Sequence, residues 1–203
     1  MKYLFLLFLG LSNLFFAQKN KKGLDVVSNI EAKIIVLKSI GNNHLAKLLT
    51  PFYGFGFAGN LMTPLNFGIG LDYNVLSSNV KYGEQNVYGN IGSPTITNID
   101  LYLTHRDILS EDFSIEEMAG FSYYRQTNFL IDSKSQKLKD NATGFNLGGK
   151  VLYTLDREGY QQVFLSGKVN FYFTNIYNEN SEIQKFYSHS TFLSLNFGYR
   201  YNF

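Results

Sequence analysis

The 203-residue chain contains no cysteine and no tryptophan, and it has only three prolines. Without thiols it cannot be a disulfide-stapled secreted module or a zinc or iron–sulfur protein with cysteine ligands. Charge is also scarce, because Asp, Glu, Lys and Arg make up 17% of the residues, against roughly 25% in soluble domains. The net charge of +2 and the mean hydropathy of −0.11 favour neither a nucleic-acid binder nor a helical membrane protein.

Aromatic residues are abundant instead. The chain has 15 Tyr and 19 Phe, which is 17% of its residues, together with 18 Gly. A chain this poor in charge and this rich in aromatic side chains indicates that something other than water faces part of its surface.

The N-terminal segment has the layout of a secretory signal peptide. Met1 and Lys2 give it a positive start, residues 3–11 are almost entirely apolar, and Ala17 provides a small residue for cleavage. The apolar run is too short for a transmembrane helix, which needs about 20 residues, although an uncleaved anchor remains an alternative. We predict a cleaved signal peptide over residues 1–17, a short periplasmic segment over residues 18–28 with a solvated basic stretch at residues 19–22, and a barrel over residues 29–203.

Most of the mature chain alternates between large apolar residues and small or polar ones. In the segment 53–61, for example, Tyr53, Phe55 and Phe57 alternate with glycine and alanine. Neighbouring side chains of a strand point to opposite faces, so this alternation is typical of a strand between lipid and a polar interior. The same pattern predicts strands over residues 53–61, 67–75, 98–104, 144–153, 163–174 and 193–203.

Two further strands are less regular. Residues 29–38 carry apolar side chains on both faces near their end, which leaves the register open. A strand over residues 113–129 would turn Glu117 toward lipid, unless Glu117 lies beyond the apolar zone or a bulge resets the register. A helix over residues 110–118 is a competing interpretation, because Ser110 is followed by acidic residues suited to a first helical turn.

These segments make eight strands whose connections alternate in length. The connections 63–66, 105–112 and 155–161 are short, whereas 41–49, 77–94, 132–141 and 177–185 are longer and rich in Asn, Ser, Lys and Gly. Short turns at one rim and long polar loops at the other are typical of outer-membrane barrels, and closure leaves no backbone group unpaired in hydrocarbon. The predicted fold is an all-β, eight-stranded antiparallel up-and-down transmembrane β-barrel. A soluble barrel with its apolar face inside is the alternative, since alternation alone does not say which face is wet.

Aromatic residues near the strand ends are expected to form interfacial girdles: Tyr53, Tyr73, Tyr153, Tyr199 and Tyr201. The last segment, TFLSLNFGYRYNF, looks like the closing strand that the outer-membrane assembly machinery recognises, with Tyr199, Tyr201 and Phe203 as the assembly signal. With a leader ending in FFAQ and the hairpin FYGFGFAGNLMTPLNFGIGLDYNV, the chain resembles the small porin-like or outer-membrane β-barrel domain proteins of Bacteroidota. The resemblance implies a Gram-negative outer-membrane location. Members of such eight-stranded groups are mostly adhesins or structural or stress-associated barrels, and a few are lipid-modifying enzymes.

Charged residues fall on the small-and-polar face of the predicted strands. The expected lumen charges are Asp72, Asp100, Lys150, Lys168 and Arg200, with Glu31, Lys33, Glu116 and Arg125 as candidates to join them. Buried charges must be paired or hydrogen-bonded. Because eight strands leave an interior only wide enough for side chains, the mixed signs predict a salt-bridged plug rather than a selective pore.

Candidates for catalysis are few. The three histidines are His44, expected in a loop, His105, expected at a turn, and His189. Nucleophilic catalysis needs a hydroxyl within reach of a histidine, and Ser190 and Thr191 follow His189. Outer-membrane lipid A deacylases place a His and a Ser two residues apart on one strand, but here Thr191 stands in the second place. A polar pair at the outer rim is the favoured interpretation.

The glycines Gly54, Gly56 and Gly59 match the G-x-G-x-x-G spacing, but they lie within an alternating strand rather than at a strand-to-helix turn, so they do not predict nucleotide binding.

We predict a non-enzymatic, monomeric outer-membrane barrel with a structural or surface-binding role through its outer loops. No cofactor, metal or nucleic acid is expected. The expected partners are outer-membrane lipid and lipopolysaccharide, the barrel assembly machinery and an extracellular ligand of unknown nature. A small-solute channel and a lipid A-modifying hydrolase are the alternatives.

Overall fold

The computed structural model describes residues 26–132, 136–175, 177 and 179–203. The predicted signal peptide and the basic stretch at residues 19–22 lie outside the described residues.

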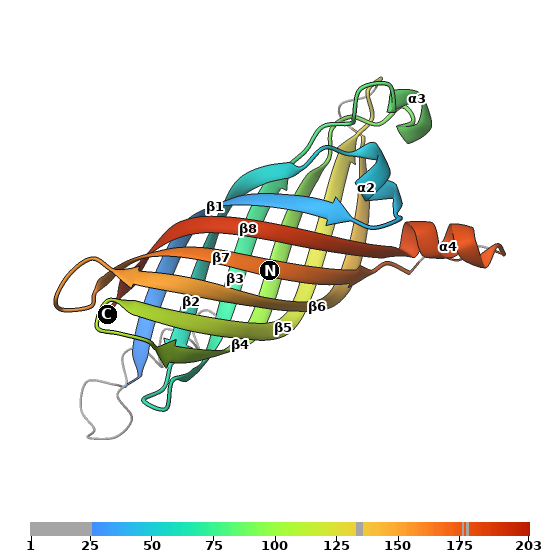
Figure 1. Ribbon diagram of the computed structural model, residues 1–203. Coiled ribbons are helices and arrows are strands. Elements are labelled where there is room, and N and C mark those ends of the chain that lie inside the picture. The colour runs from blue at the N-terminus through green and yellow to red at the C-terminus, as the bar shows by residue number, and fades with distance from the viewer. Residues whose placement is uncertain (1–25, 133–135, 176, 178) are drawn as a thin grey trace.

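Eight antiparallel strands form a closed barrel in which each strand pairs with its neighbours in sequence and β8 pairs with β1 (Figure 1). The strands are β1 (Val27–Ile40), β2 (Phe52–Met62), β3 (Phe67–Ser77), β4 (Thr95–Ile108), β5 (Phe113–Phe129), β6 (Lys137–Thr154), β7 (Gln161–Phe173) and β8 (His189–Asn202). The predicted fold class is confirmed. The competing helix over residues 110–118 is wrong, because β5 begins at Phe113 and pairs along its whole length with β6.

The register fixes the width of the barrel. Paired residues followed from Phe67 of β3 around the wall, through β4 to β8, β1 and β2, lead back to β3 at Ser77. The offset is 77 minus 67, or 10 residues, which with eight strands corresponds to a strand tilt of about 40°. Such a barrel has an interior filled by side chains.

The two ends of the barrel differ. The short-turn end carries the connections 63–66, 109–112 and 155–160 and the C-terminus, and the long-loop end carries the connections 41–51, 78–94, 130–136 and 174–188. Three helices belong to the long-loop end: α2 (His44–Leu48), α3 (Gln85–Tyr88) and α4 (Ser181–Ser188) (Figure 1). None of the helices in the described ranges is long and apolar enough to cross a membrane.

The turn 63–66 joins β2 to β3 at the short-turn end. The Thr63 N–H donates to the Phe67 carbonyl at 2.8 Å, and Asn66 takes a φ of 63°. Asparagine tolerates this left-handed conformation better than most residues, so the turn predicted from the sequence closes without strain. The sequence-based placement of His105 at a turn is wrong, because β4 continues to Ile108 and His105 pairs with Glu117 across the sheet.

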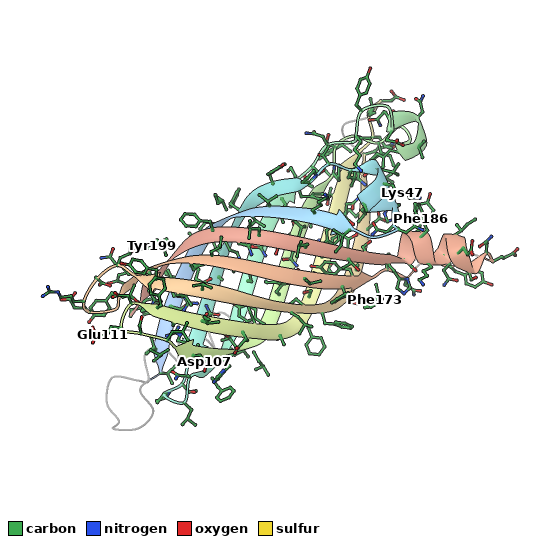
Figure 2. The ribbon with its side chains drawn as sticks, viewed as in Figure 1. Lys47, Asp107, Glu111, Phe173, Phe186 and Tyr199 are labelled. Atoms are coloured by element: carbon green, nitrogen blue, oxygen red, sulfur yellow. The ribbon has the colours of Figure 1, made fainter. Side chains whose placement is uncertain are left out.

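The outer wall of the barrel is apolar. Large hydrophobic side chains are exposed on every strand, among them Ile34, Phe121 and Leu195 at 66%, 74% and 57%. In a soluble barrel these side chains would fill the core, so the apolar-inside alternative is wrong. Figure 2 shows side chains projecting outward along the wall, with Phe173 toward the long-loop end and Tyr199 at the short-turn end.

Two sequence-based details of the wall are resolved by the register. Glu117 points outward without a bulge, since β5 and β6 pair residue by residue on both sides of it. Four of the five girdle tyrosines lie near strand ends, Tyr53 at the long-loop end and Tyr153, Tyr199 and Tyr201 at the short-turn end. Tyr73 does not, because it lies in the middle of β3 opposite Ile99.

The lumen has a polar part and an apolar part. On β1, for example, the inward residues Glu31 and Lys33 are followed toward the long-loop end by Ile35 and Leu37, all of them buried. The expectation of an interior filled mostly by small and polar residues is therefore wrong for the long-loop half. Glycine makes room for the larger inward side chains: a Cβ on Gly198 would lie 2.5 Å from the Phe164 ring.

Candidate functional site: the closed lumen

The first group of lumen charges surrounds Arg200 on β8, and we call it the Arg200 cluster: Arg200, Glu31, Glu116, Lys150 and Arg106. The Arg200 guanidinium donates to both carboxylate oxygens of Glu116 at 2.7 and 2.6 Å, and its Nε donates to Glu31 Oε1 at 2.8 Å. Lys150 Nζ lies 2.6 Å from the same Glu31 oxygen. Arg106 completes the group through a hydrogen bond from its Nε to Glu116 Oε1 at 2.9 Å.

The second group lies nearer the long-loop end, and we call it the Asp72 cluster: Lys33, Asp72, Lys168 and Asp100. Lys168 Nζ lies 3.0 Å from Asp72 Oδ2 and 2.6 Å from Asp100 Oδ2, and Lys33 Nζ lies 2.5 Å from Asp72 Oδ2. The four side chains come from β1, β3, β4 and β7, so the chain of ion pairs crosses the lumen from wall to wall.

Both clusters are dry. Every member except Arg106 has a side-chain exposure of 5% or less. Removing such ions from water is costly unless each is paired and hydrogen-bonded, and every member of the two clusters has at least one ion-pair partner. The structure thus brings together all five charges that the sequence assigned to the lumen, together with Glu31, Lys33 and Glu116.

Arg125 is the exception among the candidates, and its assignment to the lumen is wrong. It lies on the outward face of β5, between the buried Tyr124 and Gln126, and its Nε donates to Asn141 Oδ1 at 3.0 Å. Conversely, the sequence analysis missed Arg106, because that residue falls within the segment that was expected to be a turn.

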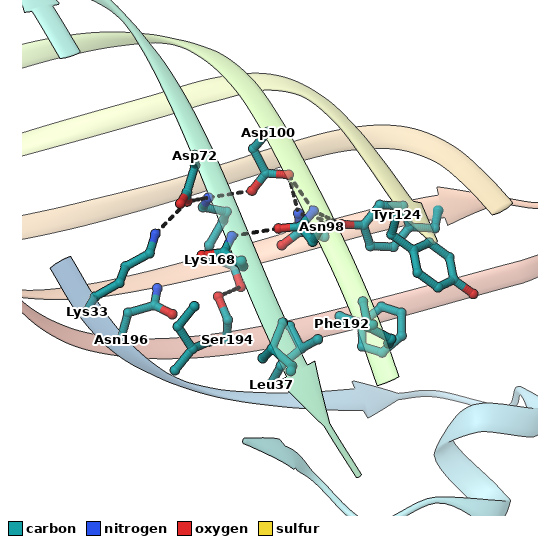
Figure 3. A pocket seen from close by; sticks show the side chains of 16 residues that line it. Lys33, Leu37, Asp72, Asn98, Asp100, Tyr124, Lys168, Phe192, Ser194 and Asn196 are labelled. Carbon is teal, nitrogen blue, oxygen red and sulfur yellow. Dashed lines mark hydrogen bonds and ion pairs between the residues drawn. The ribbon is translucent and has the colours of Figure 1, made fainter. Parts of the chain in front are cut away.

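Buried amides and a tyrosine form the next layer toward the long-loop end. Asn98 Nδ2 donates to Asp100 Oδ1 at 2.8 Å and to the Tyr172 hydroxyl at 2.6 Å, and Asn170 Nδ2 donates to the same hydroxyl at 3.2 Å. These bonds connect the Asp72 cluster with the aromatic side chains above it (Figure 3).

The empty space in this region is small. A cavity of about 20 Å³, lined by residues including Lys33, Asp72, Lys168 and Phe192, lies between the ion pairs and the aromatic layer (Figure 3). That volume admits about one water molecule. Asp72 Oδ1 and Asn74 Oδ1 face it without a hydrogen-bond partner in the described residues, so a single water would satisfy them.

An apolar layer, which we call the plug, closes the lumen at the long-loop end. Its members are Ile35, Leu37, Leu45, Leu49, Phe52, Leu76, Ile96, Tyr124, Ala142, Tyr172 and Phe192. Phe192 is fully buried and lies edge-on to the rings of Phe52 and Tyr124, with centroids 6.2 and 6.1 Å away. Leu45 contributes to the plug from α2, in the loop beyond β1. Asn43 caps that helix by accepting a hydrogen bond from the Ala46 N–H.

Two ionisable side chains in the loops above the plug, His44 and Tyr88, have shifted pKa values. Burial lowers the pKa of His44 from its ordinary value, although a hydrogen bond with the Phe186 carbonyl and the charge of Asp140 oppose the shift. Burial, reinforced by Asp140, raises the pKa of Tyr88 to about 12. Both side chains are therefore neutral near pH 7.

The catalytic candidates do not form a charge-relay arrangement. His189 and Thr191 lie on the outward-facing side of β8, and Ser190 is buried on the inward side. The described partner of His189 Nδ1 is the hydroxyl of Ser188, at 2.7 Å, and not that of Ser190 or Thr191. The described residues show no carboxylate paired with His189, although an oriented base needs a third group to hold it.

One group of side chains on the outer wall has the ligand types of a metal site. The ligand atoms of His105, Asp107 and Glu117 lie within 4.8 Å of one another near the short-turn end. His105 Nδ1 lies 3.2 Å from Glu117 Oε2, and all three side chains are substantially exposed. This contact with His105 gives the outward carboxylate of Glu117, which the sequence left unexplained, a polar partner.

The charges outside the lumen are unevenly divided between the two ends. At the long-loop end the described residues carry seven cations, Lys38, Lys47, Lys81, Arg125, Lys137, Lys139 and Lys185, and five acids, Glu84, Asp132, Asp140, Glu179 and Glu182. At the short-turn end they carry Arg157 and six acids, Asp107, Glu111, Asp112, Glu117, Asp156 and Glu158. Counted over the described residues, the long-loop end is therefore net positive and the short-turn end net negative.

Solved structures with the same architecture are bacterial outer-membrane proteins. Neisserial surface protein A matches with a TM-score of 0.59 and 12% identity over 90% of this chain and 100% of its own. Ail, the attachment invasion locus protein of Yersinia pestis, solved in complex with the heparin analogue sucrose octasulfate, matches with a TM-score of 0.56 and 11% identity over 88% and 99%. A major outer membrane protein from Thermus thermophilus matches with a TM-score of 0.59 and 13% identity over 87% and 99%.

No protein-family model and no curated protein matches the chain. The apolar wall, the closed eight-stranded sheet and the structural matches define an outer-membrane β-barrel protein. Its lumen is filled from wall to wall by ion pairs, amides and an apolar plug.

Proposed function

We propose that this protein is a closed barrel that anchors its long loops at the outer surface of a Gram-negative outer membrane, for an envelope or surface-binding role, and that it does not conduct solutes. The single observation that carries the proposal is the filled lumen. A solute would have to break the Arg200 cluster, the Asp72 cluster and the plug in turn, and the remaining cavity is about 20 Å³.

The orientation follows from the loops and termini. With an even number of strands, β1 begins and β8 ends at the short-turn end, which in bacterial outer-membrane barrels is the periplasmic one. The predicted signal peptide over residues 1–17 delivers the chain to that side. The net positive long-loop end would then face an outer leaflet rich in phosphate.

Conductance measurements test closure. Reconstituted in planar bilayers, the wild-type protein is expected to give no discrete current steps under conditions in which an open porin in the same bilayer does. Regular single-channel steps from the wild-type protein would favour the alternative of a small-solute channel.

Proteolysis of intact cells tests the orientation. Trypsin added outside is expected to cut after Lys81 or Lys185, which are in the long connections, and to reach Arg157, in a short turn, only after the outer membrane is permeabilised. Cleavage at Arg157 in intact cells, with Lys81 protected, would reverse the proposed orientation.

Four finer assignments belong to the same proposal. Tyr199, Tyr201 and Phe203, which point outward at the end of β8 and beyond it, serve as the signal for the barrel assembly machinery. The protein is monomeric and belongs to the small barrels of Bacteroidota. We also propose that it is not an enzyme, since the hydroxyl in contact with His189 Nδ1 belongs to Ser188 and not to the candidate nucleophiles Ser190 and Thr191. Release of fatty acid from lipopolysaccharide, lost in His189→Ala, would contradict this assignment.

A further inference from the structure

The outward face of the β5–β6 hairpin changes character where it leaves the lipid-facing band. Outward residues of β5 run from Phe121 through Tyr123 to Arg125, and those of β6 run from Phe145 through Thr143 to Asn141. Aromatic side chains thus give way to polar and charged ones on both strands at the same level.

Three cations share this face above the band, and we call them the β5–β6 basic face: Arg125, Lys139 and Lys137. In the register Arg125 pairs with Asn141, Lys139 with Thr127 and Lys137 with Phe129. The cations therefore stand on successive outward rungs of one hairpin. The last pair between β6 and β7 is Thr143 with Phe173, so these rungs stand beyond the end of β7.

No described acidic side chain neutralises this face. Arg125, Lys137 and Lys139 form no ion pair with a described residue, whereas every cation of the two lumen clusters does. Asp140, between Lys139 and Asn141, points to the opposite face of the strand, as the alternation of side chains requires. Asp132 is held by a hydrogen bond from Asn90 Nδ2.

Neighbouring side chains hold two of the cations against the hairpin. The Arg125 guanidinium donates to the Tyr123 hydroxyl at 3.0 Å and to Asn141 Oδ1, and Lys137 Nζ lies 5.1 Å from the centre of the Phe129 ring. A guanidinium fixed in this way presents its remaining N–H groups outward, and arginine and lysine are the usual partners of phosphate.

The level of the basic face matches a membrane headgroup layer. A strand rises about 3.3 Å per residue, which at a tilt of about 40° is about 2.5 Å along the barrel axis. Eight residues separate the outward Glu117 from the outward Arg125 on β5, or about 20 Å along the axis, so these two charged side chains stand near opposite edges of an apolar band about 25 Å tall. Arg125 therefore stands at the outer edge of that band, and Lys139, which pairs with Thr127, stands at least about 5 Å farther out along the axis.

We propose that the β5–β6 basic face binds the phosphate groups of an anionic glycolipid of the outer leaflet, whose acyl chains lie along Phe121, Phe145 and Phe171 below. Continuity of the face with the lipid-facing wall favours a lipid over a soluble anion. The succession of three cations suits a headgroup that carries more than one phosphate. This inference rests on the proposed outer-membrane location and orientation but not on closure of the lumen.

Native mass spectrometry of the detergent-solubilised barrel, titrated with lipid A carrying two phosphates, tests the site. Each of Arg125→Gln and Lys139→Gln is expected to weaken binding about fivefold, as removal of one cation from an anionic membrane surface does, and the double variant is expected to weaken it about 25-fold. Lys185→Gln, which removes an exposed cation from α4 at the same end, is the matched control and should bind as the wild type does. All variants should show the same shift in gel mobility on boiling, which reports a folded barrel.

The other arms separate the sources of phosphate. Lipid A stripped of its phosphates should bind about 25-fold more weakly than the intact lipid, as the double variant does, and inorganic phosphate at the same concentration should not displace the intact lipid. Equal binding by the double variant and the wild type would overturn the proposal while leaving the outer-membrane location intact. Displacement of the lipid by equimolar sucrose octasulfate would assign the face to a soluble polyanionic sugar and would also overturn it. Failure of the proposed location would show separately, as inaccessibility of Lys81 to trypsin in intact cells.

Discussion

The two halves of the lumen are formed by the same strands, but one is filled by ion pairs and the other by apolar packing. On β8 the inward residue Arg200 belongs to an ionic cluster at one end, and Phe192, eight residues before it, belongs to the apolar plug at the other. The same change occurs on β4 between Asp100 and Ile96. In the ionic half the interactions are directional and fail if one partner is lost, whereas in the plug they depend on shape and volume.

The order of the two halves has a physical consequence. The plug and α2 separate the Asp72 cluster from the solvent at the long-loop end, so its charges have few partners other than one another. A polar network in such surroundings is stabilising only when every member is satisfied. The plug therefore keeps the ionic half dry.

The largest effect is expected in the Arg200 cluster. Arg200→Met leaves Glu31 and Glu116 without their main partner in a dry site, which should lower the free energy of unfolding by about 3–5 kcal/mol. Urea-induced unfolding in lipid vesicles measures the change. Arg157→Met, at an exposed turn, is the control and should stay within about 0.5 kcal/mol of the wild type. Equal stability of the two variants would show that the ionic half contributes little.

The plug should respond to loss of volume rather than of charge. Phe192→Ala removes a ring packed against Phe52, Tyr124 and Tyr172, with centroids 5.7 to 6.2 Å apart. The expected loss is about 3 kcal/mol, because the substitution removes the buried ring and leaves a cavity in its place. Phe197→Ala on the outward face of the same strand is the matched control, and its cost should be smaller because lipid fills the space that the ring leaves. A larger loss of stability for Phe197→Ala than for Phe192→Ala would show that the packed core lies on the outward face of the barrel and not in the lumen.

The sequence predicted the wall better than the lumen. Alternation is a local property, so eight strands, their turns and the outward rows ending in Tyr199 and Tyr201 could be read directly from neighbouring residues. The ion pairs could be anticipated only as a set, because pairing Arg200 with Glu116 requires the register of β5 against strands far away in sequence.

The residues whose direction the sequence did not predict lie near the long-loop ends of the strands. The inward residues Leu37, Leu76 and Ile96 lie near strand ends, where the inward face is apolar and the usual contrast between an apolar outward and a polar inward face is lost. Arg125 was a candidate for the lumen, although its position in the alternation of β5 is outward. At the rim of a membrane barrel the outward face is polar again, and there the register, rather than the chemical type of the residue, decides which way it points.

A smaller effect is expected where the two halves meet. Tyr172→Phe keeps the ring in the plug and removes the hydroxyl that accepts hydrogen bonds from Asn98 and Asn170. The expected loss is about 1 kcal/mol, the net contribution of an ordinary buried hydrogen bond, measured by the same urea unfolding. If Tyr172→Phe costs as much as Phe192→Ala, then the amide layer and the plug form one cooperative unit rather than two.

The smallest effect concerns the cover of the plug. His44 begins α2, its Nδ1 lies 3.4 Å from the Phe186 carbonyl, and its ring lies 5.1 Å from that of Tyr187 in α4. Burial lowers the pKa of His44 in the folded protein, so the packed form favours the neutral ring. The stability from this contact is therefore present above the unfolded pKa of about 6.5 and is lost as the pH falls below it.

Hydrogen exchange of the α2 amides, corrected for intrinsic rates, measures that loss. Protection of α2 is expected to decrease between pH 7.5 and pH 5, while the strands that carry the plug stay protected. His44→Gln removes the titrating group, so its α2 protection should be low and independent of pH over this range. An unchanged pH dependence in His44→Gln would assign the effect to another group near α2, with Asp140, whose charge acts on His44, as the first to examine. A parallel loss of protection in the plug strands would show that α2 and the plug open together, which would join the cover to the apolar half of the lumen.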